Sequence, residues 1–433
     1  MIPASLVERA RRVARPEVYG RVRRMVGLRV EIVGLQAAIG DLVGVELPGS
    51  ELVAEVVAFD DDALVCLPLG HPQGMRRQLR ARVLPEGLSI GVGDELRGRV
   101  LDGLGHPIDG RGMPVGIERV ELTMAPPHPL ERQPVVEALP LGVKALDTLL
   151  TCGRGQRLGI FAGSGVGKST LLSMLTRGTT AEVAVLALIG ERGREVEEFV
   201  HAQLGQEGLA RSVVVVATSD QPALVRLTAA RTATRIAEWF RDEGHDVLLL
   251  MDSLTRFAMA QREVGLAAGE PPTTRGYPPS TFSALAGLLE RAGQGAGGSI
   301  TGLYTVLVEG DDMDEPIADA ARSILDGHVV LSRSLASRGH FPSIDVLASV
   351  SRLAPVLQDS RQREIAMSAR RLLALYEENR DLIEVGAYRS GATPEVDRAI
   401  AARPALDAAL TQASALVTTP EAAWAELAQA VTA

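Results

Sequence analysis

A glycine-rich loop carries the clearest chemical signal in the sequence. Residues 162–170 read Ala-Gly-Ser-Gly-Val-Gly-Lys-Ser-Thr and lie between the apolar run 158–161 and the apolar run 171–175. Strand, glycine loop and helix in this order form a P-loop, in which backbone N–H groups and the helix N-terminus surround phosphate oxygens. The loop therefore predicts nucleotide binding. The expected contacts are Gly163, Ser164, Gly165, Val166, Gly167, Lys168, Ser169 and Thr170.

Two side chains of the loop and one distant carboxylate have the chemistry of a magnesium–nucleotide site. Lys168 would place a cation on the β- and γ-phosphates, and the Ser169 hydroxyl is the expected Mg²⁺ ligand. Asp252 ends the apolar run 247–251, so it would lie at the carboxyl end of a strand and complete the metal site. A strand-terminal aspartate is more often a helix cap, and that alternative stays open for Asp252.

A second acidic position follows another apolar run. Glu191 and Arg192 come directly after residues 183–189. At the same edge of a parallel sheet, the Glu191 carboxylate could orient and polarise an attacking water, and Arg192 could contact the γ-phosphate. From the residues alone, a solvated charged turn is the better interpretation of Glu191 and Arg192.

Composition excludes several classes of protein. The chain has 433 residues, a net charge of −9 and only 3% aromatic residues, which disfavours a nucleic-acid binder. The N-terminus lacks an apolar signal region, and no apolar run approaches the roughly 18 residues that span a bilayer. Two cysteines cannot form a disulfide framework. We expect a cytoplasmic protein.

The pattern of elements predicts five segments. Residues 1–18 form a basic amphipathic helix, which is either a solvated surface helix or a docking arm for a partner protein or acidic lipid headgroups. Residues 19–95 form short strands of a small β-barrel. Residues 96–140 are a linker and entry segment, with a turn-rich entry at 98–110 and an extended linker where five prolines fall between positions 126 and 140. In residues 141–360, buried strands alternate with amphipathic helices, which is typical of an α/β fold with a mainly parallel sheet. Residues 361–433 are helical.

Beyond these motifs, residues 20–400 resemble a known family. Residues 151–161 and 331–342 resemble the type III protein-export ATPases, and residues 342–351 match a signature shared with the catalytic subunits of rotary ATP synthases. The resemblance implies a RecA-like P-loop core behind an N-terminal β-barrel and before a helical C-terminal domain. Residues 376–388 are similar to the flagellar members of the export branch more than to the virulence injectisome members.

The same resemblance implies roles for four side chains. Glu191 would activate water, Arg192 would contact the γ-phosphate, Arg352 would be an arginine finger for a neighbour's nucleotide, and Phe341 would stack on adenine. From the residues alone, Arg352 is better interpreted as an ordinary salt-bridge partner and Phe341 as a core aromatic. Non-catalytic relatives usually carry glutamine where this chain has Glu191, so a purely regulatory subunit is disfavoured. ATP is then the substrate and Mg²⁺ the cofactor.

The family also implies partners. It predicts a homo-hexameric ring that hydrolyses ATP to drive flagellar type III protein export. The ring would contact a negative-regulator, stator-like export protein through the N-terminal helix, a central stalk-like protein, the export gate at the inner membrane, and complexes of chaperones with export substrates. It would sit peripherally on the cytoplasmic face of the membrane export apparatus. The alternatives are an injectisome ATPase, the catalytic β-type subunit of a proton-translocating ATP synthase, and a ring motor that binds nucleic acid.

Overall fold

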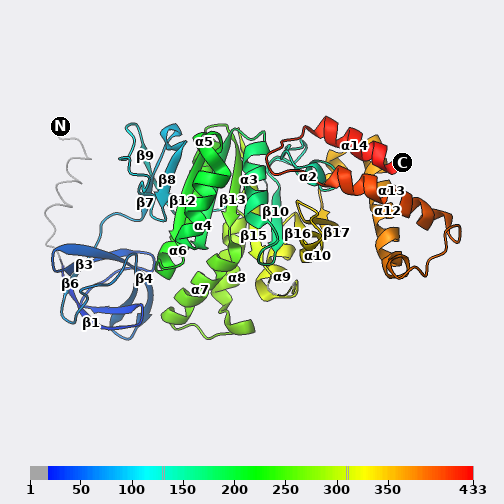
Figure 1. Ribbon diagram of the computed structural model, residues 1–433. Coiled ribbons are helices and arrows are strands. Elements are labelled where there is room, and N and C mark those ends of the chain that lie inside the picture. Colours follow the sequence, from blue (N-terminus) through cyan, green and yellow to red (C-terminus); the bar gives the residue numbers. More distant parts are fainter. Residues whose placement is uncertain (1–17, 129, 131, 309, 311, 433) are drawn as a thin grey trace.

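Three regions follow one another along the molecule, as Figure 1 shows. The computed structural model describes residues 18–432 except 129, 131, 309 and 311. The predicted docking helix, residues 1–18, lies almost entirely outside the described residues. A β-barrel comes first, a large sheet flanked by helices lies in the middle, and helices of the C-terminal region cover the far end.

The first region is a closed barrel with its own core. Its strands pair in the order β1-β2-β5-β4-β3-β6. Along β4 buried side chains alternate with partly exposed ones, because successive side chains of a strand point to opposite faces. Val22, Val30, Ile32, Val43 and Val45 fill the interior. The predicted small barrel is confirmed. The strands are β1 (Gly20–Val26), β2 (Arg29–Val33), β3 (Leu42–Leu47), β4 (Ser50–Asp60), β5 (Ala63–Pro68) and β6 (Arg80–Val83).

The central sheet has the order β17-β16-β10-β15-β13-β11-β12-β8. Neighbouring strands are parallel except that β17 runs against β16 and a short β14 runs against β15. Near-continuous apolar sequences such as 183–189 suit strands that are covered on both faces. The strands are β8 (Arg99–Asp102), β10 (Arg157–Ala162), β11 (Val183–Glu191), β12 (Ser212–Thr218), β13 (Asp246–Asp252), β14 (Gly293–Gln294), β15 (Ser299–Leu307), β16 (Gly327–Leu331) and β17 (Ile344–Ser351).

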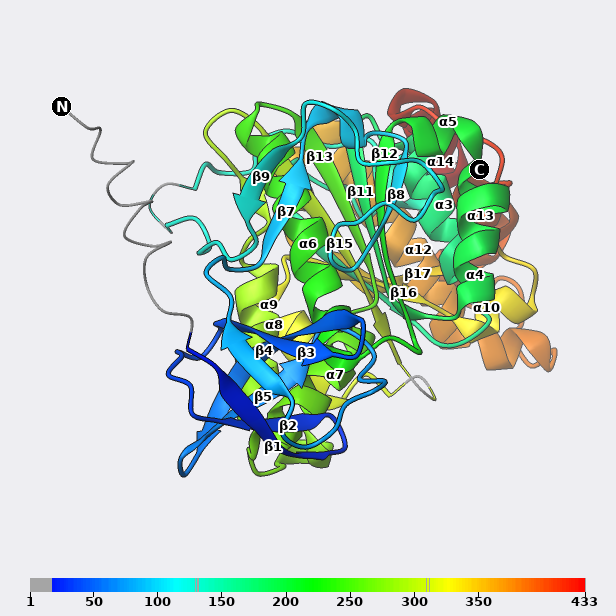
Figure 2. The ribbon, with the colours of Figure 1, turned by 90° about the vertical axis from the view of Figure 1, so that its left-hand side faces the viewer.

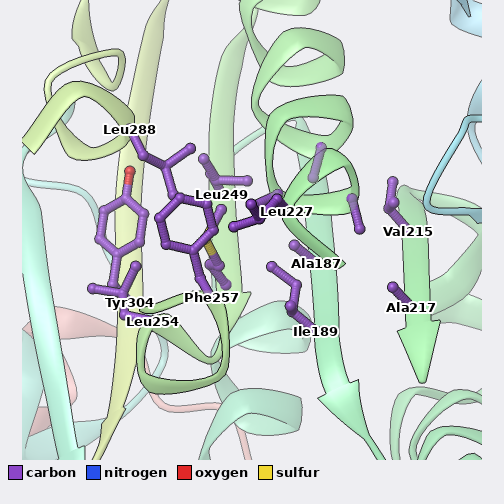
Figure 3. Close-up of a cluster of buried hydrophobic side chains, with 14 of the residues drawn as sticks. Ala187, Ile189, Val215, Ala217, Leu227, Leu249, Leu254, Phe257, Leu288 and Tyr304 are labelled. Carbon is purple, nitrogen blue, oxygen red and sulfur yellow. The ribbon is translucent and has the colours of Figure 1, made fainter. Parts of the chain in front are cut away.

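One face of this sheet packs on helices of the core region. Figure 3 shows Phe257, Leu227 and Leu288 meeting strand residues such as Ile189 and Leu249. Figure 2 shows the helices divided between the two faces of the sheet. The helices of this face are α6 (Ala223–Asp242), α7 (Leu254–Ala268), α8 (Pro279–Leu289) and α9 (Pro316–Ile324), with a short 3₁₀ turn, η4 (Thr274–Gly276), between α7 and α8.

The other face packs on the P-loop helix and, through it, on the C-terminal helices. Leu172 and Leu175 share one buried cluster with Leu406 and Leu427 of the C-terminal region. The predicted helical C-terminal domain is confirmed. The helices of this side are α2 (Lys144–Asp147), α3 (Lys168–Gly178), α4 (Gly193–Glu198), the π-helical turn η3 (Phe199–Leu204), α5 (Gly205–Ala210), α10 (Arg333–Ser337), α11 (Ala354–Leu357), α12 (Ser360–Glu384), α13 (Pro394–Leu410) and α14 (Pro420–Thr432).

The segment between the barrel and the core is more structured than a plain linker. Strand β8 lies inside the predicted linker 96–140 and pairs with β12 at the edge of the central sheet. The sequence does not indicate this strand, because it has only four residues and lies within a turn-rich segment. A 3₁₀ turn, η1 (Asp94–Leu96), precedes β8, and β7 (Ser89–Val92) pairs with β9 (Glu118–Glu121) as a separate hairpin. Within the described residues, no helix is both long and apolar enough to cross a bilayer.

Candidate active site

The carboxyl ends of three parallel strands bring the predicted groups together. The P-loop follows β10, Glu191 is the last residue of β11, and Asp252 is the last residue of β13. Because parallel strands end at the same edge of a sheet, these residues meet although up to 84 positions separate them. Thr305, on the intervening strand β15, donates a hydrogen bond of 2.6 Å from Oγ1 to Asp252 Oδ1 and so fixes the carboxylate.

The P-loop has the backbone shape that an anion cradle requires. Gly167 has a φ of 90°, a left-handed conformation that side-chain-bearing residues rarely adopt, and it immediately precedes α3. The Ser343 hydroxyl donates a 2.6 Å hydrogen bond to the Val166 carbonyl and holds the loop from the side. The helix N-terminus therefore points its free N–H groups into the space in front of the loop.

A cavity of about 640 Å³ opens in front of the loop. Its size suits a nucleoside triphosphate, since small-molecule sites span roughly 300–1,000 Å³. The lining residues are Ala162, Gly163, Ser164, Gly165, Gly167, Lys168, Ser169, Thr170, Gly190, Glu191, Arg192, Glu195, Ser219, Arg256, Leu307 and Val308.

Lys168 joins the two carboxylates into one charged cluster. Its Nζ atom pairs with Asp252 Oδ1 and lies 3.6 Å from Glu191 Oε1. All three side chains are largely buried, with 13%, 7% and 16% exposure for Lys168, Asp252 and Glu191. One ammonium therefore faces two carboxylates in a site where water screens charge poorly.

This arrangement perturbs Glu191. Burial raises the pKa of the Glu191 carboxyl to about 7, and the neighbouring negative charge of Asp252 adds to the rise while Lys168 opposes it. A carboxylate with a pKa near neutrality can accept a proton from water and release it again at physiological pH. Strongly shifted acids in a cleft are typical of functional sites.

The oxygen donors at the loop fit a magnesium ion that arrives with phosphate. Ser169 is exposed to the cavity, and Asp252 ends the strand behind it. Both offer hard oxygen ligands, which Mg²⁺ prefers. Among the described residues no three His, Cys, Asp or Glu side chains form a metal site by themselves. Mg²⁺ commonly binds through one or two carboxylates plus substrate phosphates, so this sparse set suits it.

Two arginines line the cavity, and the sequence pointed to only one of them. Arg192 is 81% exposed and pairs with Glu195 across 3.3 Å, at the rim. Arg256 is the third residue of α7 and packs against Gly190. A Cβ atom at position 190 would lie 2.9 Å from the Cβ atom of Arg256, so only glycine fits at position 190. The buried Nε atom of Arg256 has no hydrogen-bond partner among the described residues. Arg256 lies in the first turn of the helix that follows Asp252, and this position directly after a strand end is the signal that could have identified it.

Phe341 lies beside the P-loop rather than in the lining of the cavity. Its ring carbons Cδ1 and Cε1 lie 3.6 Å from the position that a Cβ atom would take on Gly167. The residue is 46% exposed, so part of its surface is accessible to a ligand. A half-exposed aromatic ring next to a phosphate loop can stack on a base.

Arg352 lies at the opposite edge of the sheet from the P-loop, where the parallel strands begin. Its backbone N–H donates to Asp326 O at 3.0 Å, and the Asp326 N–H donates to Arg157 O at 2.8 Å, which places it beside the first residue of β10. The P-loop follows the last residue of that strand, roughly 17 Å away at about 3.3 Å per residue. Arg352 is exposed, and its Nη2 atom contacts only the Arg322 carbonyl within the described residues, at 3.2 Å. It cannot serve the cavity of its own chain.

Two protein families match the chain. Residues 142–351 match the ATP synthase alpha/beta family, nucleotide-binding domain. Residues 358–429 match the T3SS EscN ATPase C-terminal domain. The chain is 50% identical over 391 residues to the flagellum-specific ATP synthase of Bacillus subtilis, which covers 90% of this chain and 89% of that protein. It is also 50% identical over 384 residues to the type 3 secretion system ATPase of Xanthomonas euvesicatoria, with 88% and 87% covered.

Solved structures match to a similar extent. The assembled ATPase EscN from the type III secretion system of enteropathogenic E. coli superposes with a TM-score of 0.91 and 46% identity, over 95% of this chain and 100% of that one. The same ATPase in complex with its central stalk EscO gives a TM-score of 0.88 and 45% identity, over 95% of this chain and 100% of that one.

Proposed function

Since the chain belongs to the family of flagellum-specific ATP synthases and type 3 secretion system ATPases, we propose that it hydrolyses ATP to drive flagellar type III protein export. The family and the ATPase activity agree with the expectations from the sequence. The observation that carries the chemistry is the charged cluster of Lys168, Asp252 and Glu191 at the P-loop.

The residues divide the reaction between them. The P-loop N–H groups and Lys168 hold the triphosphate, and Glu191 accepts a proton from the attacking water as it approaches the γ-phosphorus. Arg192 and Arg256 face the same cavity and neutralise charge on the γ-phosphoryl oxygens. Ser169 and Asp252 would hold Mg²⁺, which neutralises charge on the β- and γ-phosphates when bound. Phe341 carries the base.

A second copy of the chain completes the site. Arg352 is exposed and lies at the far edge of the sheet from the cavity, so it acts on the nucleotide of a neighbouring protomer. One chain then holds both halves of a composite site, as a closed homo-oligomer requires. The relative EscN forms an assembly, which supports such an oligomer, and we propose a hexamer as its form.

The partners follow the relatives. EscN binds a central stalk, EscO, and a stalk-like protein would occupy the corresponding place here. The negative regulator, the export gate and the complexes of chaperones with their substrates remain further partners of this proposal, with the protein held at the cytoplasmic face of the membrane. Type 3 secretion system ATPases are as similar to this chain as flagellar ones are, so an injectisome ATPase is the second candidate.

Hydrolysis by the unmodified chain and by Glu191→Gln, measured over a dilution series, tests this function. Removing a general base lowers rates by about 10²–10⁴-fold, so we expect the variant to bind ATP but hardly turn it over. Specific activity of the unmodified chain should rise with protein concentration as protomers meet. Glu198→Gln, a matched change at an exposed position of α4, should leave turnover unchanged.

Two results would contradict the proposal. Turnover by Glu191→Gln at the unmodified rate would remove that carboxylate from the mechanism. Strong stimulation of hydrolysis by single-stranded RNA or DNA would favour a nucleic-acid motor over protein export. Restored swimming when the gene is returned to a flagellar-ATPase deletion strain, without restored secretion in an injectisome deletion strain, would decide between the two export systems.

A further inference from the structure

The loop between α13 and α14, residues 411–419, lies across three parts of the nucleotide-binding region. The Gln412 N–H donates to the Phe341 carbonyl at 2.9 Å. Arg177, in the last turn of the P-loop helix α3, donates through Nη2 to the Ser414 carbonyl at 2.7 Å. The Thr418 N–H reaches the Gly142 carbonyl at 3.4 Å. A loop of the C-terminal region therefore reaches residues near both ends of the P-loop helix, because Phe341 lies beside Gly167 and Gly142 lies beside Gly178.

The side chain of Gln412 is the centre of these contacts. It is only 8% exposed. Its Oε1 atom accepts from the Lys144 N–H at 3.0 Å, and its Nε2 atom donates to the carbonyls of Gly142 at 2.8 Å and Leu416 at 2.7 Å. Both hydrogens of the amide and its oxygen are thus engaged. No other uncharged side chain of this length offers two donors and an acceptor at one end.

Phe341 is held at three neighbouring points. Its carbonyl is bound by Gln412, and Ser343, two residues later, is bound to the Val166 carbonyl of the P-loop. His340, one residue earlier, has Nδ1 at 3.7 Å from Asp407 Oδ1 on α13. Two of these three supports come from the C-terminal region and only one from the P-loop itself.

We propose that Gln412 is a positioning residue for the base of the nucleotide. Its side chain locks the 411–419 loop to α2, and its backbone N–H then fixes Phe341 against the P-loop. This inference rests on the proposed function, in which Phe341 carries the base. The affinity for ATP then depends on how the C-terminal helices sit, while the groups that act on the triphosphate, Lys168 and Glu191, lie elsewhere and are unaffected.

A double-mutant cycle tests the proposal in the full chain. Gln412→Ala should raise the KM for ATP about tenfold and change kcat less than twofold, because binding is lost without loss of transition-state contacts. Phe341→Ala should raise KM to a similar degree. In the double variant Gln412→Ala/Phe341→Ala, KM should equal that of Phe341→Ala, since both changes remove the same interaction. Gln429→Ala, exposed on α14, is the matched control and should leave both constants unchanged.

The outcomes separate this inference from the function beneath it. An unchanged KM in Gln412→Ala, or effects that multiply in the double variant, would overturn the positioning role while leaving the function intact. An unchanged KM in Phe341→Ala would instead show that Phe341 does not bind the base. It would overturn both the proposed role of Phe341 and the positioning role of Gln412. A fall in kcat without a rise in KM would show that Gln412 acts on the chemistry and would also overturn the proposal.

Hydrogen exchange in the unmodified chain provides a measurement that needs no variant. A non-hydrolysable ATP analogue with Mg²⁺ should slow exchange both in the P-loop, residues 163–170, and in the 411–419 loop. Protection of the P-loop alone would overturn the link between the base and the C-terminal loop. Gln412→Glu gives a second variant if Gln412→Ala does not fold, because the carboxylate keeps the acceptor and loses both donors.

Discussion

The central sheet has a P-loop edge, where its parallel strands end, and an opposite edge, where they begin. These two edges are built in different ways. At the P-loop edge, Lys168, Asp252 and Glu191 crowd together with little access to water, and the pKa of Glu191 is raised to about 7 as a result. At the opposite edge, Arg352 is exposed and follows Ser351, which is held by neutral hydrogen bonds. In the proposed function, the Glu191 carboxylate at the first edge gains and loses a proton during the reaction. The Arg352 guanidinium at the second edge would stay charged and act from a fixed position.

At the second edge, a buried network of amides and hydroxyls holds the backbone next to Arg352. Ser351 donates through Oγ to the Thr151 carbonyl at 2.8 Å and accepts from Gln156 Nε2 at 3.1 Å. Gln358 donates through Nε2 to the Thr148 carbonyl at 2.8 Å and to Thr151 Oγ1 at 2.9 Å. A network in which each member has partners holds its backbone in one position. If Arg352 acts on a neighbour's nucleotide, as proposed, it needs a fixed position more than a shifted pKa.

Removing the guanidinium of Arg352 is expected to have the largest effect. An arginine finger contributes about 10³–10⁵ in rate, so Arg352→Ala should lower kcat by at least about 10³-fold and leave nucleotide binding intact. Mixing it in equal amounts with Glu191→Gln should restore activity, because roughly a quarter of the interfaces in a randomly mixed ring then join an intact cavity to an intact arginine. Steady-state hydrolysis by the mixture measures this.

The control for that experiment is Arg361→Ala, an exposed arginine at the start of α12, which should behave like the unmodified chain. If mixing restores nothing although the two variants co-assemble, Arg352 does not act across an interface, and the contrast between the two edges loses its explanation.

The pH dependence of the P-loop edge is expected to be the next largest effect. Glu191 must be ionised to accept a proton, and its pKa of about 7 lies above the ordinary value of 4.5. The ionised fraction therefore falls as pH drops below 7, and kcat/KM should fall about tenfold per pH unit there and level off above about 8. A pH–rate profile of the unmodified chain measures the effect. A flat profile between pH 5.5 and 8 would show that Glu191 is not the base.

The smallest effect is expected from weakening the hydrogen-bond network that holds the backbone next to Arg352. Gln358→Ala removes two buried hydrogen bonds, while the Thr151 hydroxyl still donates to the Thr148 carbonyl at 2.8 Å. At about 0.5–1.5 kcal/mol for each lost bond, the change should cost about 1–3 kcal/mol of stability. The Tm should drop by several degrees, kcat should fall severalfold and the KM for ATP should stay unchanged. Differential scanning calorimetry and steady-state kinetics measure these changes, with Gln429→Ala as the control. A raised KM with unchanged kcat would place Gln358 with the cavity instead.

The sequence predicted the parts of this architecture that repeat simple patterns. The apolar runs 158–161, 183–189 and 247–251 correspond to β10, β11 and β13. They could be predicted because parallel strands covered on both faces have near-continuous apolar sequences. The strand ends placed Lys168 and Asp252 together, and the role of Glu191 at the same edge was assigned through the family resemblance. The sequence did not reveal β8, whose four residues sit among turns, or the cavity-facing position of Arg256.

The contacts of Gln412 could not have been predicted from the sequence. Its side chain binds Gly142, 270 positions away, and a lone glutamine after a helix has no local signature. Arg352 was assigned through the family resemblance, and only the strand pairing shows that it stands beside the start of β10. Long-range placement of single polar side chains depends on the packing of whole elements, which periodicity does not encode.

The closed barrel has a consequence for how copies of the chain can associate. A strand at an open sheet edge offers unpaired backbone groups that add a neighbour's strand, and such growth has no natural stopping point. In residues 20–83 every strand has a partner on both sides. Adjoining barrels must therefore recognise one another through side chains, so that contact can be weakened or strengthened one substitution at a time without starting a fibre.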